Sequence, residues 1–300
     1  MDRVIVIVGP TAVGKTALSL DVAEVVGGEV VSADSRQVYR GLDLGTGKIR
    51  PEEMRDIPHH LLDVADPRRV FTAHDYVRLG TEALRDIHTR GRTPVVVGGT
   101  GLYVDALLGR MPLAQVEPNE ELREQLAGCS LQQLQEQLQH LDPRRYETID
   151  AKNPRRLIRA IEIASAGKPR DTQYGIRNTQ YATLWIGLTL PKEELRERIR
   201  ARILARLEAG MLNEARKLHA QGLTYERMEQ LGLEYRLMAC HLQGTLSYDD
   251  MIYHMEKEIV AYAKRQMTWF KKNSDIQWFS PHDKEKIISV VHSFLEGSIV

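Results

Sequence analysis

The sequence predicts an α/β protein with a mostly parallel sheet and an inserted all-helical subdomain. In its N-terminal third, short β-branched runs alternate with helical patterns, which is typical of βαβ units in a parallel sheet. Residues 119–166 are rich in Gln and Arg and show no strand signal, and a strand pattern returns at Ala182–Leu190. We therefore expect a core with C-terminal helices over residues 1–115 and 180–300, interrupted by a helical insertion domain over residues 116–179.

Each element is expected from its local pattern. Short apolar runs bounded by Gly or polar residues indicate buried strands. The strands expected are Val4–Val8, Glu29–Ser32, His59–Val64, Pro94–Val97, Ala182–Leu190 and Ile276–Phe279. Apolar residues at helical spacing indicate helices. The helices expected outside the insert are Lys15–Val26, Ala73–Arg90, Lys192–Gly210, Met211–Gln221, Glu234–Leu242, Tyr248–Lys272 and Lys284–Leu295.

The composition is that of an ordinary globular protein. The 300 residues include 41 Lys+Arg and 41 Asp+Glu, and 42% are hydrophobic, which excludes the disordered, collagen-like and coiled-coil classes. Two cysteines are too few for a disulfide framework or a Cys-rich zinc site. The chain shows no secretory signal and no apolar run long enough to span a bilayer. We expect a soluble cytoplasmic protein with no membrane segment.

Basic residues are concentrated locally although the net charge is zero. Residues 140–210 hold 15 Lys/Arg against 9 Asp/Glu, and a second basic group comprises Lys264, Arg265, Lys271 and Lys272. A local basic surface can bind a phosphate backbone. Solvated helix faces would explain the same pattern equally well.

The turn after the first strand carries a phosphate-binding motif. It comprises Gly9, Pro10, Thr11, Ala12, Val13, Gly14, Lys15 and Thr16, which fits the pattern G-x-x-x-x-G-K-[ST] between a buried strand and a helix. The glycines let backbone N–H groups face an anion, Lys15 adds a positive charge, and the Thr16 hydroxyl is the expected Mg²⁺ ligand. The motif predicts a P-loop NTPase-like core that binds a diphosphate group, but it does not identify the ligand.

A second polar group follows the next strand. Asp34, Arg36 and Gln37 are expected at the carboxyl edge of the sheet, where α/β proteins assemble their sites. Asp34 could accept a proton or a hydrogen bond from a substrate amine. A lone Asp in a loop is more often a turn former or a helix cap, so the residues alone leave both interpretations open.

With these motifs, the sequence resembles the tRNA dimethylallyltransferases, also called tRNA isopentenyltransferases. The similarity runs nearly end to end, apart from residues 116–122, which hold fewer prolines than the family pattern. It rests on Gly9–Thr16, Asp34–Tyr39, Gly45–Lys48, Pro58–Asp63, Val97–Tyr103, Asn153–Ala160 and Arg265–Phe270, in this order and spacing. No Cys/His zinc finger follows the core, so we expect the bacterial type.

The resemblance implies a reaction. Such enzymes transfer a dimethylallyl group from dimethylallyl diphosphate to N6 of the adenine that lies 3′-adjacent to the anticodon in tRNA. The P-loop and Mg²⁺ would then stabilise the charge that develops on the leaving diphosphate. By the same resemblance Asp34 aligns the weakly nucleophilic amine and takes its proton. Thr100 is expected at the carboxyl end of a strand, where its hydroxyl could contact the diphosphate or the reacting nucleotide, and a helix N-cap is the alternative.

Two arginines of a later helix are further catalytic candidates. Arg198 and Arg202 lie at i and i+4 and therefore share a helix face, and the resemblance implies that they reach the diphosphate. A planar guanidinium suits phosphate oxygens. Ion pairs with Glu194 or Glu197 are the alternative.

The resemblance also implies that the anticodon stem-loop of tRNA is the partner. The target base must leave its stack to react, and sequence-specific RNA recognition concentrates on such loops. The residues expected to contact tRNA, partly from the insertion domain, are Asp34, Ser35, Arg36, Gln37, Thr100, Arg123, Arg155, Arg156, Arg159, Arg265 and Trp269. Solvated helix faces and core packing are the alternatives for the arginines and for Trp269. No protein partner is implied, and we expect a monomer.

Three other functions are compatible with a P-loop. An adenylate isopentenyltransferase would use the same chemistry on a free nucleotide, but a small acceptor needs no extended phosphate-tracking surface. A P-loop small-molecule kinase would need ATP and a lid arginine. A nucleotide-driven switch would need segments that become ordered around a γ-phosphate, and none is recognisable in the sequence.

Overall fold

The computed structural model describes residues 2–114, 116–167 and 181–297. The described residues form two compact units. The first unit consists of residues 2–110 and 181–297, and the second contains the insert. The second unit begins at Met111, slightly before the start that we expected.

Arg110 explains where the first unit ends. Its guanidinium donates to Asp275 Oδ2 at 2.8 Å and lies over the ring of Trp185, 5.2 Å from the ring centroid. These contacts hold Arg110, the last residue of the N-terminal part of the first unit, against Trp185 of the sheet. The chain therefore leaves the first unit only after Arg110.

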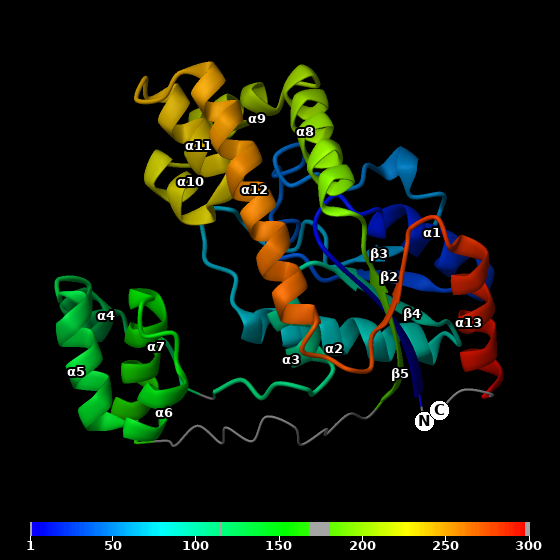
Figure 1. Cartoon of the computed structure of the whole chain (residues 1–300), viewed down its shortest axis with the longest axis horizontal. Coiled ribbons are helices and arrows are strands. Elements are labelled where there is room, and N and C mark those ends of the chain that lie inside the picture. The colour runs from blue at the N-terminus through cyan, green and yellow to red at the C-terminus, as the bar shows by residue number, and fades with distance from the viewer. Residues whose placement is uncertain (1, 115, 168–180, 298–300) are drawn as a thin grey trace. The chain divides into compact units, whose positions relative to one another are not determined.

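Six parallel strands form the sheet of the first unit (Figure 1). Their spatial order is β3-β2-β4-β1-β5-β6. Their bounds are β1 Asp2–Val8, β2 Glu29–Ser32, β3 His59–His60, β4 Pro94–Gly98, β5 Tyr181–Leu188 and β6 Gln277–Phe279. Central β1 pairs with β4 and β5, so that Ile5 lies beside Val95 and Leu184. The predicted α/β class with a parallel sheet is confirmed.

Both faces of the sheet are covered by helices. Alternate residues of β1 point to opposite faces: Val4, Val6 and Val8 join one core cluster, whereas Ile5 and Ile7 join another. The first cluster includes residues of α2 (Ala73–Thr89) and α3 (Gly101–Leu107), and the second includes residues of α1 (Lys15–Val26) and α13 (Lys284–Glu296). Burial on both faces explains why the strands read as continuous apolar runs.

A group of C-terminal helices has its own core. The helices are α8 (Lys192–Glu208), α9 (Met211–Ala220), α10 (Tyr225–Leu231), α11 (Leu233–Leu242) and α12 (Tyr248–Phe270). They bury Met and Leu side chains against residues 38–42. The long helix α12 runs from this group to α3 beside the sheet (Figure 1). It therefore contacts both the helical group and the sheet core.

The third strand is shorter than predicted. We expected a strand over His59–Val64, but β3 contains only His59–His60. Leu61 and Asp63 have φ values of 65° and 57°, in the left-handed region that a β-strand cannot contain. The turn directs the Asp63 carboxylate at the ammonium of Lys48, 2.6 Å away.

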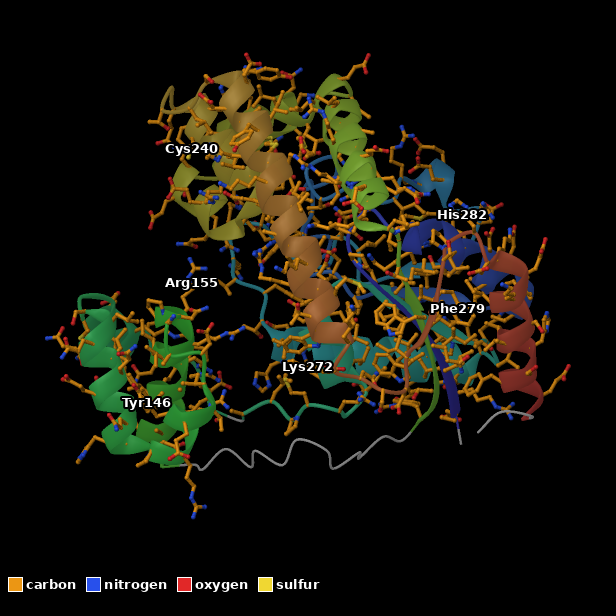
Figure 2. All side chains as sticks on the ribbon, viewed as in Figure 1. Tyr146, Arg155, Cys240, Lys272, Phe279 and His282 are labelled. Atoms are coloured by element: carbon orange, nitrogen blue, oxygen red, sulfur yellow. The ribbon has the colours of Figure 1, made fainter. Side chains whose placement is uncertain are left out.

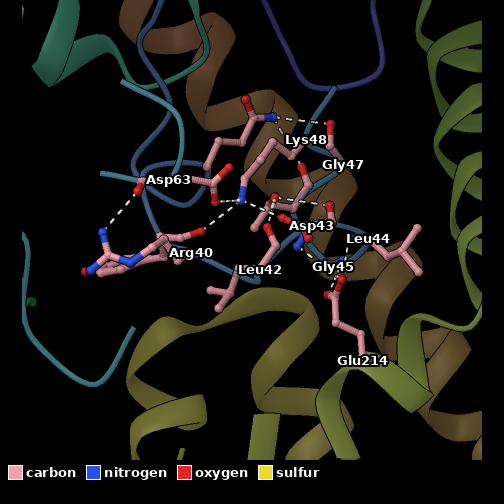
Figure 3. A network of polar contacts seen from close by, with 12 residues as sticks. Arg40, Leu42, Asp43, Leu44, Gly45, Gly47, Lys48, Asp63 and Glu214 are labelled. Carbon is pink, nitrogen blue, oxygen red and sulfur yellow. Dashed lines mark hydrogen bonds and ion pairs between the residues drawn. The ribbon is translucent and has the colours of Figure 1, made fainter. Parts of the chain in front are cut away.

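Lys48 anchors the segment that contains Gly45-Thr46-Gly47 (Figure 3). Its side chain is 5% exposed and lies 2.6 Å from both the Asp43 and the Asp63 carboxylates. It also donates to the Tyr39 carbonyl at 2.9 Å. All of its donors have protein acceptors, so this Lys stabilises a loop and does not bind phosphate.

Glu214 of α9 holds the same loop from the other side (Figure 3). Its carboxylate accepts hydrogen bonds from three successive backbone N–H groups, those of Asp43, Leu44 and Gly45, at 3.1, 2.7 and 3.0 Å. The Tyr235 hydroxyl donates to it as well, at 2.6 Å. The loop is thereby fixed beside α11.

The second unit is a small helical bundle. It consists of α4 (Glu120–Ala127), α5 (Leu131–Leu141), α6 (Pro143–Thr148) and α7 (Pro154–Ser165), around a leucine-rich core. Side chains of Asn119, Ser130, Asp142 and Asn153 cap the four N-termini. Polar caps and a narrow apolar stripe explain how this Gln- and Arg-rich segment folds.

A buried carboxylate joins two helices of this bundle. The Glu162 side chain is 1% exposed and lies 3.0 Å from the Arg123 guanidinium. It also accepts from the Asn119 N–H at 2.6 Å and from Arg159. Burial acts to raise the pKa of Glu162, but these donors outweigh burial and lower it. Two of the arginines that we expected to contact tRNA therefore have a structural role within the bundle.

No helix in the described ranges is both long and apolar enough to cross a membrane. Cys129 and Cys240 are free thiols.

We predict that Arg159→Ala destabilises the bundle by about 1–2 kcal/mol, because it removes one of the donors to a buried carboxylate. Hydrogen exchange on the whole chain should show faster amide exchange in α4 and α7. Arg155→Ala is the matched control: Arg155 is exposed on the same helix (Figure 2) and has no ion pair among the described residues. Equal exchange rates in both variants would contradict the prediction.

Candidate active site

The P-loop follows β1 and opens α1. Gly9 and Gly14 have φ values of 145° and 107°, which side-chain-bearing residues rarely adopt. A Cβ on Gly9 would lie 2.6 Å from the backbone oxygen of Leu188, so close packing against β5 also requires glycine. Gly14 precedes α1 without a side-chain cap, and the free N–H groups of the first turn favour an anion there.

The ammonium of Lys15 points back into the loop, where it donates to the Pro10 carbonyl at 2.7 Å. Burial lowers the pKa of Lys15 to about 7, with a further contribution from the Arg202 charge, while Asp34 acts in the opposite direction. An incoming anion would stabilise the ammonium form. Lys15 is therefore well placed to couple anion binding to proton uptake.

Gln266 of α12 connects the P-loop to the turn after β4. Its buried amide accepts from the Thr11 N–H at 2.8 Å and donates to the Gly99 carbonyl at 2.9 Å. A Cβ on Gly99 would collide with this amide. The absence of a side chain at Gly99 thus allows α12 to bridge two loops at the edge of the sheet.

Two more residues of α12 lie against the end of this turn and the helix that follows it, α3. Tyr262 lies close to the Thr100 side chain, which opposes the rise that burial causes in the pKa of Tyr262, and the indole N–H of Trp269 donates to Asp105 of α3 at 2.8 Å. Thr100 is the N-cap residue of α3, but its side chain does not cap the helix. Its hydroxyl accepts instead from the Ser35 N–H at 3.0 Å. Thr100 therefore links the end of β4 to the loop after β2.

Asp34 starts that loop as an Asx turn. Its Oδ1 accepts from the N–H groups of Arg36 and Gln37, at 2.8 and 3.4 Å, a pattern that fixes the orientation of the carboxylate. Among the described residues, none donates a hydrogen bond to Oδ2. The turn interpretation and the functional interpretation are thus compatible, because one oxygen makes the turn and the other remains available.

A cavity of about 280 Å³ lies beside Asp34. It lies at the carboxyl edge of the sheet, because Thr11 follows β1 and Asp34 follows β2, and such edges hold the ligands of α/β proteins. Its lining residues are Thr11, Asp34, Ser35, Arg36, Gly45, Thr46, Arg202, Gly232, Leu233, Glu234, Tyr235, Ile259, Tyr262 and Arg265. Its wall combines two carboxylates, three guanidinium groups and an apolar surface.

The two predicted catalytic arginines have different surroundings. Arg202 donates to the Thr11 hydroxyl and lines the cavity, and burial lowers its pKa to about 10. Arg198 instead pairs with Glu194 at 2.8 Å, the alternative that we had considered, and does not line the cavity. One turn beyond Arg202, the buried Arg206 approaches Glu234.

The residues expected to contact tRNA also differ in their surroundings. Ser35, Arg36 and Arg265 line the cavity. The Gln37 amide donates to the Thr46 and Gly47 carbonyls at 3.5 and 3.3 Å, so it supports the loop. In the second unit, Arg156 pairs with Asp150 at 3.3 Å, and Arg155 remains exposed.

Three residues of the site were missed from the sequence. Gln266 lies inside the motif Arg265–Phe270, which is one of those that carry the family resemblance. We expected Arg265 and Trp269 of the same motif to be its functional residues, because a charged and an aromatic side chain suit RNA contact better than an amide. Arg206 continues the i, i+4 spacing of Arg198 and Arg202, which was a usable signal. Glu234 appeared only as the first residue of a predicted helix and had no local signal of function.

The comparisons with known proteins agree on one family. A family model described as IPP transferase matches residues 37–273. The chain is 37% identical to the tRNA dimethylallyltransferase of Halalkalibacterium halodurans, over 99% of this chain and 98% of that protein. It is 43% identical to tRNA dimethylallyltransferase 1 of Geotalea uraniireducens, over 90% of this chain and 88% of that protein.

Solved structures are similar to the chain as well. The full-length tRNA isopentenylpyrophosphate transferase of Bacillus halodurans matches with a TM-score of 0.73 and 36% identity, over 99% of this chain and 96% of that one. A eukaryotic dimethylallyltransferase acting on tRNA matches with a TM-score of 0.85 and 26% identity, over 99% of this chain and 80% of that one.

We predict that diphosphate binding weakens as the pH rises above about 7, because Lys15 then loses its proton in the free protein. Bound diphosphate raises the pKa of Lys15, so binding above pH 7 must take up a proton and becomes less favourable at higher pH. Calorimetry with inorganic diphosphate at pH 6.5–9 measures this. In Lys15→Arg the decrease should largely disappear, since arginine stays charged. Identical pH profiles would rule out Lys15 as the origin.

We predict that Gln266→Ala raises the Kd for inorganic diphosphate about tenfold, because the Thr11 N–H loses the acceptor that holds the P-loop in place. Thr268→Ala should keep the original Kd, because Thr268 lies on the exposed side of the same helix and its hydroxyl donates to the Lys264 carbonyl at 2.9 Å. An unchanged Kd in Gln266→Ala would show that the bridge does not shape the P-loop.

Proposed function

The chain belongs to the IPP transferase family, and from that premise we propose the reaction that its cavity supports. It transfers a dimethylallyl group from dimethylallyl diphosphate to N6 of the adenine 3′-adjacent to the anticodon in tRNA, and releases diphosphate. The main supporting observation is that the P-loop residue Thr11 and the carboxylate of Asp34 line one cavity. A phosphate-binding loop and a proton acceptor are thus adjacent, as this reaction requires.

In this proposal the P-loop binds the leaving group. The diphosphate lies against backbone N–H groups of the P-loop other than that of Thr11, which binds Gln266, with the charges of Lys15 and Arg202 beside it. As the C–O bond of the donor breaks, negative charge grows on the diphosphate, and these preorganised groups stabilise it. Surrounding water would weaken these interactions. Because Lys15 and Arg202 are largely buried, little water lies around their charges.

Asp34 acts on the acceptor. The N6 lone pair attacks C1 of the dimethylallyl group, the N6–C1 bond forms as the C1–O bond breaks, and diphosphate departs. The proton released from N6 passes to Asp34 Oδ2. Because two backbone N–H groups hold Oδ1, the carboxylate needs no reorientation during the step. In this scheme Thr100 holds Ser35 and so maintains the position of the Asp34 loop beside the nucleotide.

Mg²⁺ would be held mainly by the diphosphate. Thr16 is exposed on the first turn of α1, where its hydroxyl can serve as one ligand. The described residues contain no cluster of three or more His, Cys, Asp or Glu side chains suited to a metal. This donor set fits Mg²⁺, which often binds through substrate phosphates and keeps several waters. When bound, the ion would neutralise charge on the leaving group.

The acceptor is the anticodon stem-loop of tRNA, whose target base is extruded into the cavity. Ser35, Arg36 and Arg265 surround the cavity and can contact the flanking nucleotides. Of the bundle arginines predicted to contact tRNA, Arg155 is the one left for a phosphate, since Arg123 and Arg159 bind Glu162 and Arg156 pairs with Asp150. We propose that the protein acts as a monomer in the cytoplasm.

Mass spectrometry tests this function. Protein, Mg²⁺ and dimethylallyl diphosphate are incubated with an unmodified anticodon stem-loop RNA and, separately, with AMP. A five-carbon mass gain on the RNA adenine supports the proposal. A gain on AMP alone would indicate an adenylate isopentenyltransferase, and ATP consumption with a small acceptor and no gain would indicate a kinase.

We predict that Asp34→Asn lowers the single-turnover rate on the RNA at least 100-fold, because an amide cannot take the N6 proton. The Kd for inorganic diphosphate should not rise, because Asp34 belongs to the acceptor side and the loss of its negative charge beside Arg202 favours anion binding. An unchanged rate would exclude Asp34 as the base. Arg198→Gln is the control, because Arg198 does not line the cavity. Its single-turnover rate shows how much the loss of a charge outside the cavity changes the reaction.

A further inference from the structure

The cavity wall contains a second carboxylate that the proposed reaction does not use. Glu234 lies in the first turn of α11 and lines the cavity. The two preceding residues have unusual backbones, with φ of 74° at Gly232 and 43° at Leu233. Leucine rarely adopts a positive φ, and such outliers persist where the surrounding structure over-determines them, often at functional sites. The backbone of Gly232 and Leu233 therefore places Glu234 in the cavity wall.

Glu234 faces Arg206 of α8. The closest charged atoms of the two side chains are 3.8 Å apart, and the side chains are 12% and 13% exposed. Arg206 is covered by Gly47, where a Cβ would collide with the guanidinium. The pair is therefore enclosed by the loop that Lys48 and Glu214 stabilise. Its charges are little screened by water.

Arg206 lies one turn after Arg202, so two buried guanidinium groups share a helix face. Arg206 disfavours the charged form of Arg202, and Glu234 favours it. Glu234 is one of the carboxylates that offset these two charges: Asp34 acts on both arginines and Glu214 on Arg206, but Glu234 is the one that forms an ion pair with Arg206. The carboxylate reduces the positive potential beside the P-loop.

A P-loop that releases a diphosphate has two opposing requirements. Positive charge must stabilise the leaving group as it forms, but too much positive charge would retain the product after the reaction. We propose that Glu234 is a counter-charge to Arg202 and Arg206 that limits the affinity of the P-loop for diphosphate and so permits product release. This inference rests on the proposed function, since it assumes that diphosphate occupies the P-loop.

The test is calorimetry of Mg²⁺ and inorganic diphosphate with the full chain. In Glu234→Gln we expect the Kd to fall about tenfold, the size of one charge interaction in a partly buried setting. Under steady-state turnover kcat should fall, while the single-turnover rate should remain near the original, because only release is slowed. A merely structural residue would weaken binding when altered, so the sign of the change is diagnostic.

Two variants serve as controls. Glu234→Asp keeps the charge and should retain the original Kd. Glu256→Gln is the matched control: Glu256 is also buried and binds two arginines of α8, Arg196 and Arg200, at 2.9 and 2.7 Å. It does not line the cavity, so its variant should bind diphosphate as the original protein does.

An unchanged or higher Kd in Glu234→Gln would overturn the inference. If that variant does not fold, Arg206→Gln tests the same idea with opposite sign: it leaves Glu234 unneutralised and should raise the Kd about tenfold. An unchanged Kd in Arg206→Gln would overturn it as well. Failure of the original protein to bind diphosphate at all would instead contradict the proposed function.

Discussion

The buried amide of Gln266 joins the two halves of the candidate site. It accepts from the P-loop at Thr11 and donates to the turn after β4 at Gly99, while Trp269 of the same helix donates to Asp105 of α3. Because α12 is a single helix of 23 residues, the diphosphate loop and the Asp34 loop are held against one rigid element. Sites supported by helices keep their geometry better than sites made of loops alone.

Buried charges in this protein fall into two groups that differ in how completely they are paired. Lys48 and Glu162 have protein partners on every side, and they join segments of the fold. Lys15 in the P-loop and Arg202 and Glu234 in the cavity wall are largely buried and incompletely paired, so their charged forms cost more free energy. That cost decreases when a polyanion enters. Incomplete pairing therefore favours the entry of an anion.

Glycine motifs in the sequence have two different physical origins. Gly9 and Gly14 are required by positive φ in a loop that can surround an anion. Gly99 and Gly101 are required because Gln266 and Trp269 of α12 occupy the space of their side chains. Both kinds look alike in a sequence. Only the first kind indicates a ligand directly, whereas the second indicates that another element approaches closely.

The sequence alone determined the parallel sheet, the P-loop and the place of Asp34 after β2, because these depend on local periodicity and on short motifs. The tertiary structure decided which arginines of α8 face the cavity, that Glu234 joins them, and that Arg123 and Arg159 bind Glu162. It also ended β3 at His60. These outcomes depend on contacts between residues far apart in the chain, and local patterns carry no information about which distant partner a charged side chain will meet.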